Sequence, residues 1–194
     1  TPIHSSAASD VYKRQAHHIR SHRFMAHVRS STGTQVSRSN CHPFIIDNWM
    51  FLHNGQIGEF ERVKYELQCQ LPESLFLKRM GTTDSELIFL LMLHNGLCEQ
   101  PVEAIRKTII DISQMMKSKD IEEPLKASIC ISDGEQFWAV RYSSDDDAPT
   151  VFIRQEGANI ALASEPLEKS SGWKAVLPQS ILEIKGDAVT SYAI

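Results

Sequence analysis

The sequence lacks several features that would define whole classes of protein. Its four cysteines, Cys41, Cys69, Cys98 and Cys130, are widely spaced and form no C-x-x-C pair, which argues against a zinc knuckle or a thioredoxin-like centre. The longest apolar run, Leu87–Leu93, is far shorter than the roughly 20 residues that a bilayer span requires. The formal net charge of −4 argues against a nucleic-acid partner, because there is no basic stripe to neutralise phosphates. We therefore expect reduced thiols and a cytoplasmic protein that binds neither membranes nor nucleic acids.

The eight histidines do not predict a metal site or another cofactor. His17, His18 and His22 form the densest group, but they have no carboxylate or cysteine partner at ligand spacing. Near Asp145–Asp147, the regular alternation of ligands that calcium sites use is missing. We therefore predict no metal and no cofactor, and interpret the acidic run as a solvated loop.

The chain is long enough for one domain with a sizeable core. It has 194 residues, of which 42% are hydrophobic. Residues 1–15 have no initiator Met, no periodicity and no signal-peptide pattern, and "SSAASDVYKRQ" is similar to translated adapter sequence. We interpret residues 1–15 as a non-native scar and residues 16–194 as a single domain.

Helical periodicity is clear in the middle of the chain. Apolar residues recur at helical spacing over residues 59–70 and 101–117. Thr83 and Glu86 match a capping box ahead of "LIFLLML", which predicts a helix that begins at Thr83 with Asp84 in its first turn. The dipole of that helix would favour the negative charge of Asp84.

Strand patterns flank these helices. Residues 24–28 predict a short strand that ends at Arg29, and "PFIIDNWMFLHNG" predicts a strand pair in which Trp49–Leu52 is the second strand and Asn54-Gly55 the turn that leaves it. After Pro124 the sequence predicts six strands, "LKASICIS", "QFWAVRYS", "TVFIR", "NIALAS", "WKAVL" and "ILEIK". This order predicts a layered α+β domain with helices on a mainly antiparallel sheet.

Four motifs between His27 and Asp84 carry the functional signal: "HVRSSTG", "NCHPF", "WMFLHNG" and "GTTDSE". They supply Arg29, the pair Asn54-Gly55 and Asp84. A guanidinium binds a carboxylate in two-pronged fashion, a carboxylate binds an ammonium, and an Asn side chain beside a Gly N–H can stabilise an oxyanion. The set therefore suits an amino acid such as glutamine.

With "ALASEPL" at residues 161–167, these motifs resemble the class II glutamine amidotransferases of the N-terminal-nucleophile (Ntn) hydrolase superfamily. The resemblance runs from about His27 to the end of the chain, and is strongest to small enzymes related to the YafJ and ergothioneine-pathway amidohydrolases. It implies a layered αββα sandwich with mainly antiparallel sheets. It also implies that Arg29 binds the substrate α-carboxylate with Thr32 lining the same loop, that Asn54 and Gly55 form the oxyanion hole, and that Asp84 binds the α-ammonium.

In such families the nucleophile is an N-terminal cysteine whose own α-amine acts as the base. That Cys-Gly start and the first strand would lie upstream of Ala16, so we expect this chain to be an inactive fragment of a γ-glutamyl amide hydrolase. The parent would release ammonia and glutamate from glutamine or another γ-glutamyl compound, alone, with a synthase partner or as a homo-oligomer. The alternative is a non-catalytic module that binds glutamine or a γ-glutamyl compound.

Each site residue also has a simpler interpretation. Arg29 could be a surface ion-pairing residue, Asn54-Gly55 an ordinary hairpin turn, and Asp84 only a helix-start residue. A thiol hydrolase using Cys41 and His42 is disfavoured, because adjacent strand residues point to opposite faces. We expect His27, His42 and His53 to have structural hydrogen bonds or packing roles.

Overall fold

The computed structural model describes residues 21–28, 37–168 and 172–194. Its main element is a six-stranded antiparallel sheet with the order β1-β2-β3-β4-β8-β9. The strands of this sheet are β1 (Phe44–Ile46), β2 (Trp49–Gln56), β3 (Lys126–Ser132), β4 (Phe137–Ser143), β8 (Ser180–Lys185) and β9 (Ala188–Ala193). A second, three-stranded sheet has the order β6-β5-β7, formed by β5 (Phe152–Glu156), β6 (Asn159–Ala163) and β7 (Lys174–Ala175).

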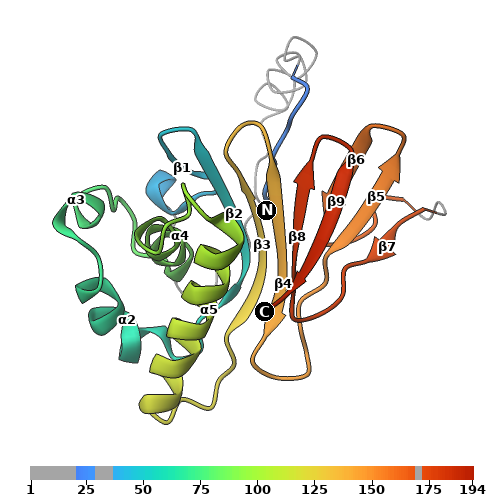
Figure 1. Cartoon of the computed structure of the whole chain (residues 1–194). Helices are drawn as coiled ribbons and strands as arrows, with labels where there is room; N and C mark the ends of the chain where they lie inside the picture. The colour runs from blue at the N-terminus through green and yellow to red at the C-terminus, as the bar shows by residue number, and fades with distance from the viewer. Residues whose placement is uncertain (1–20, 29–36, 169–171) are drawn as a thin grey trace, which may run out of the picture.

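Helices cover one side of the six-stranded sheet, and the three-stranded sheet lies on the other (Figure 1). The helical segments are η1 (Arg38–Asn40), α2 (Phe60–Cys69), α3 (Glu73–Phe76), α4 (Asp84–His94) and α5 (Pro101–Ser118). A small apolar cluster joins the two sheets, with Ala139 and Leu182 from one and Val151 and Val176 from the connections of the other. The layered α+β prediction with mainly antiparallel sheets is confirmed.

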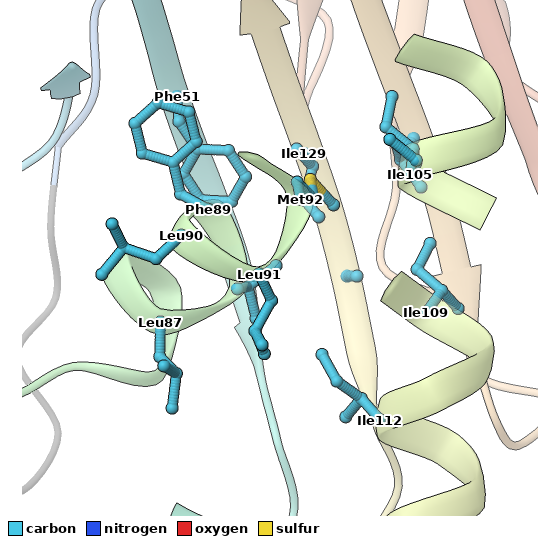
Figure 2. Close-up of a cluster of buried hydrophobic side chains, with 14 of the residues drawn as sticks. Phe51, Leu87, Phe89, Leu90, Leu91, Met92, Ile105, Ile109, Ile112 and Ile129 are labelled. Carbon is cyan, nitrogen blue, oxygen red and sulfur yellow. The ribbon is translucent and has the colours of Figure 1, made fainter. Parts of the chain in front are cut away.

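Helix α4 is buried almost all round. Leu87, Ile88, Phe89, Leu90, Leu91 and Met92 are each at most 2% exposed. Such a helix has no solvent face, so it must lie inside the domain, between the sheet and the other helices. The Phe89 ring stacks on Phe51 of β2 with the ring centroids 5.1 Å apart, and α5 packs its isoleucines against the same core (Figure 2). The apolar run of the sequence thereby fixes the N-terminus of α4 next to the sheet.

The predicted helices are confirmed, with small shifts at their ends. Two strand predictions are wrong. Residues 24–28 form no strand, and Phe24 and Val28 are exposed rather than packed. Strand β2 does not end at Leu52 but continues through Gln56, so Asn54-Gly55 is not a turn. The pairing of Asn54 with Ser128 and of Gly55 with Ala127 extends this strand, and a local turn signal cannot report such a distant partner.

Strand β9 and the short helix α3 were not predicted. Most residues of β9 are exposed, so they show no apolar alternation, and the strand depends on its pairing with β8. None of the helices in the described part of the chain is long and apolar enough to cross a membrane.

The helix–sheet interface provides a matched test of the core. Ile112 is 1% exposed and Ile110, on the other face of α5, is 40% exposed. We expect Ile112→Val to lower the free energy of unfolding by about 1 kcal/mol, because a buried methylene is lost, and Ile110→Val to change it by less than about 0.5 kcal/mol. Urea unfolding of both variants checks this, and equal losses would contradict the packing of α5.

Candidate functional site

The candidate site lies where the end of β2 meets the N-terminus of α4. Asp84 is the first residue of α4, and its Oδ2 accepts a hydrogen bond of 3.0 Å from the Ile57 backbone N–H, just after β2. Its Oδ1 accepts from the backbone N–H of Ser85 at 2.7 Å. The end of the "HNG" strand and the Asp84 carboxylate are therefore joined directly, although they are 27 residues apart in the sequence.

The loop before α4 is held in a fixed shape. Thr83 is the N-cap, and its hydroxyl accepts from the Glu86 N–H at 3.2 Å, as the capping box predicts. The Glu86 carboxylate, however, does not complete a capping box. It accepts from the backbone N–H groups of Met80 and Gly81, both at 2.7 Å, so it fixes the segment that leads to Asp84.

Two further side chains hold this loop. The Asn40 side chain accepts from the Thr82 backbone N–H at 2.9 Å. Arg79 Nε lies 3.8 Å from Glu86 Oε2, and both side chains are 6% exposed. Burial lowers the pKa of Arg79, and the Glu86 charge offsets part of this effect. The buried pair compensates two charges that would each be costly alone, and it limits the movement of Asp84.

Strand β2 presents its residues alternately to the two faces of the sheet. His53 is 3% exposed on the helix side, whereas Asn54 is exposed on the opposite face. Gly55 lies against β3, because a Cβ atom there would stand 1.9 Å from the Lys126 carbonyl oxygen. Among the described residues, Asp84 forms no hydrogen bond with Asn54 or Gly55. It contacts this segment of the chain through the backbone N–H of Ile57.

His53 lies behind Asp84, and the prediction that it makes structural hydrogen bonds is confirmed. Its Nδ1 lies 2.9 Å from Ser85 Oγ, and its Nε2 lies 3.2 Å from the Lys126 carbonyl oxygen. Burial lowers the pKa of His53, and the negative charge of Asp84 and the bond to Lys126 raise it in part. The ring is therefore neutral near neutral pH, as a buried hydrogen-bonded histidine.

The lowered pKa predicts how stability depends on pH. Below about pH 6.5 the unfolded chain protonates His53 while the folded chain does not, so the free energy of unfolding falls as the pH falls, by at most about 1.4 kcal/mol per unit. This decline ends below the folded pKa, where both states are protonated. The stability difference between the wild type and His53→Asn should therefore shrink between pH 7 and pH 5. Urea unfolding across this range measures it, and a constant difference would contradict the assignment.

Two predicted site residues, Arg29 and Thr32, lie outside the residues that the structure describes. Within the described ranges, no group of three His, Cys, Asp or Glu side chains is arranged to hold a metal ion.

Cys130 pairs with Leu52 of β2, two residues before Asn54, but burial raises the pKa of its thiol to about 12. Cys130 is therefore a thiol rather than a thiolate at neutral pH, and is unsuited to be a nucleophile.

Comparisons with known proteins agree with these motifs. The family model described as "Glutamine amidotransferases class-II" matches residues 1–157. A probable glutamine amidotransferase of Saccharomyces cerevisiae, DUG3, is 29% identical over 87% of this chain and 58% of its own length. The gamma-glutamyl-hercynylcysteine sulfoxide hydrolase of Mycobacterium tuberculosis is 25% identical over 91% of this chain and 64% of its own length. The chain thus spans about three fifths of the length of these two curated relatives.

Solved structures extend the comparison to the fold. The glutamine aminotransferase class-II domain protein from Silicibacter pomeroyi superposes with a TM-score of 0.84 and 35% sequence identity. The match covers 97% of this chain and 82% of that protein. The similarity therefore includes both sheets and the helix layer of the described structure.

Proposed function

Because the chain belongs to the class II glutamine amidotransferases, we propose that it forms the γ-glutamyl-binding site of an amidotransferase or amidohydrolase that releases glutamate from a γ-glutamyl amide. The observation that carries this proposal is the 3.0 Å bond between the Ile57 N–H and Asp84 Oδ2. It joins the strand that bears Asn54 and Gly55 to a carboxylate at a helix N-terminus. Asp84, to which we assign the α-ammonium, therefore lies beside the end of the strand to which we assign the oxyanion hole.

Asp84 retains the capacity to bind a ligand. A carboxylate has about four lone-pair positions, and two of these accept the backbone N–H groups of Ile57 and Ser85. The remaining lone pairs can accept from an α-ammonium. We assign the α-carboxylate of the substrate to Arg29, with Thr32 on the same loop, and the oxyanion to the Asn54 side chain and the Gly55 N–H.

The proposed reaction uses an N-terminal cysteine, as the family resemblance implies. Its thiolate attacks the γ-amide carbon, the tetrahedral oxyanion collapses to a γ-glutamyl thioester, and the amine or ammonia leaves with a proton. Water then hydrolyses the thioester to glutamate and regenerates the thiol. Cys41, Cys69, Cys98 and Cys130 are internal in the sequence and have no free α-amine, so we assign this role to none of them.

The substrate class that we propose is a γ-glutamyl amide, with free glutamine as one member. The assigned residues contact only the glutamyl end, which all such compounds share. The name of the mycobacterial relative gives a γ-glutamyl compound other than glutamine as the substrate of that protein. An ammonia-consuming synthase partner and a homo-oligomer both remain predictions from the sequence.

Binding of the reaction product tests the glutamyl site without requiring turnover. L-Glutamate carries the α-ammonium, and glutarate is the same molecule without it. We expect calorimetric titration of the purified chain to show saturable binding of L-glutamate, with weaker binding of glutarate. Equal affinity for the two compounds, or no binding of either, would contradict the proposed site.

A further inference from the structure

His53, Ser85 and Asp84 form a chain of polar contacts that the proposed reaction does not use. His53 Nδ1 lies 2.9 Å from Ser85 Oγ, and the same hydroxyl oxygen lies 3.3 Å from Asp84 Oδ1. The Ser85 hydroxyl has one proton, so it can donate to only one of these two acceptors at a time. If the hydroxyl proton points to Asp84, the carboxylate accepts one more internal hydrogen bond before a ligand binds. If it points to His53, that lone pair of Asp84 stays open.

The position of the Lys126 carbonyl fixes the direction. A carbonyl oxygen only accepts, so its 3.2 Å contact requires the His53 proton on Nε2. In the neutral ring Nδ1 is then an acceptor, and the Ser85 hydroxyl donates to it across the shorter of its two contacts. Asp84 Oδ1 is left with the Ser85 backbone N–H as its donor, at 2.7 Å.

We propose that His53 is a positioning residue for the substrate α-ammonium, because it holds the Ser85 hydroxyl proton away from Asp84 and leaves a carboxylate lone pair open. This inference rests on the proposed function, since it concerns the ammonium that Asp84 binds. Without an acceptor at the Nδ1 position, the hydroxyl rotates toward Asp84 Oδ1 and donates to it. The ammonium then has to compete with an internal hydrogen bond to a charged group.

The two amide substitutions at position 53 separate this role from packing. In His53→Gln the side-chain amide reaches the Nε2 position, so the contact with Lys126 can persist while the acceptor at Nδ1 is lost. In His53→Asn the amide oxygen occupies the Nδ1 position, so the acceptor for Ser85 persists while the Lys126 contact is lost. A purely structural role would make the two variants similar, or make the smaller Asn variant the worse one.

The measurement is the ratio of the affinities for L-glutamate and glutarate, obtained by calorimetry on the full chain. We expect His53→Gln to reduce this ratio about tenfold and His53→Asn to preserve it within about threefold. Ser85→Ala should preserve the ratio, because no hydroxyl remains to occupy Asp84. The double variant His53→Gln, Ser85→Ala should recover the ratio that the single His53→Gln change loses.

The controls separate this inference from the proposed function. Ser132→Ala removes another buried serine hydroxyl, one that donates to the Gln136 carbonyl, and should leave the ratio unchanged. Equal affinities in the wild type would overturn both the proposed site and this inference. A wild-type preference for L-glutamate that His53→Gln retains, or that the double variant fails to recover, would overturn the inference alone.

A second measurement uses the wild-type protein, so it does not depend on whether a variant folds. The ¹⁵N chemical shifts of the imidazole nitrogens of His53 report which nitrogen carries the proton. We expect the neutral ring of the wild type to be protonated on Nε2, with Nδ1 as the acceptor. A ring protonated on Nδ1 would require Ser85 to accept from it and to donate to Asp84, and would overturn the inference.

Discussion

Replacing Asp84 with asparagine is expected to weaken L-glutamate binding about a hundredfold, which is about 2.7 kcal/mol. The variant keeps one oxygen of the side chain but loses the charge that attracts an ammonium. In the wild type, the Ile57 and Ser85 N–H groups each donate to a different oxygen of the Asp84 carboxylate. The amide NH₂ of the variant is itself a donor, so it cannot accept the hydrogen bond of the oxygen that it replaces. The loss should therefore be large for L-glutamate and small for glutarate, which has no ammonium.

Asp47→Asn is the matched control for this change. Asp47 is a carboxylate in the β1–β2 turn, 75% exposed, and its side chain pairs with Lys78 at 3.1 Å. It contributes the same charge to the molecule without contacting the site, so its removal should change L-glutamate affinity by less than about twofold. Similar losses in both variants would mean that net charge, rather than a specific carboxylate, controls binding.

Gly55→Ala is expected to lower the free energy of unfolding by about 3 kcal/mol. The added Cβ would lie 1.9 Å from the Lys126 carbonyl oxygen and 2.6 Å from its carbon, so β2 and β3 must separate locally. The same atom would lie 2.7 Å from His53 Nε2 and would disturb the contact of that ring with Lys126. Gly55 also has φ +156°, which is unfavourable for alanine, so the loss combines backbone strain with the close approach of the two strands.

Gly134→Ala provides the comparison. Gly134 has φ +92°, and a Cβ atom there meets nothing within 4 Å. Its substitution tests the cost of an unfavourable backbone conformation alone, which should be about 1 kcal/mol. Urea unfolding of both variants gives the difference. A Gly55→Ala protein no less stable than Gly134→Ala would contradict the close packing of β2 on β3.

The sequence predicted those parts of the site that depend on local chemistry. Thr83 as a helix cap and Asp84 in the first turn follow from short-range hydrogen bonding, and the structure confirms both. The buried character of α4 follows from a run of apolar residues. These features need no knowledge of distant neighbours, because the interacting groups lie within one helical turn.

Long-range contacts decide the features that the sequence missed. Asn54-Gly55 has the composition of a turn, but pairing with β3 holds both residues in the strand. Glu86 was expected to complete a capping box, whereas it binds the segment at Met80 and Gly81. The contact of His53 with Ser85 spans 32 positions, and no local pattern indicates it.

Glutamate release by a protein that carries the N-terminal cysteine tests the proposed reaction most directly. Glutamine and other γ-glutamyl amides are supplied as substrates, and a variant of the N-terminal cysteine is assayed in parallel. We expect equimolar release of glutamate and of the amine or ammonia, abolished in the cysteine variant. An absence of release from every γ-glutamyl amide, or release that does not depend on that cysteine, would contradict the proposed reaction.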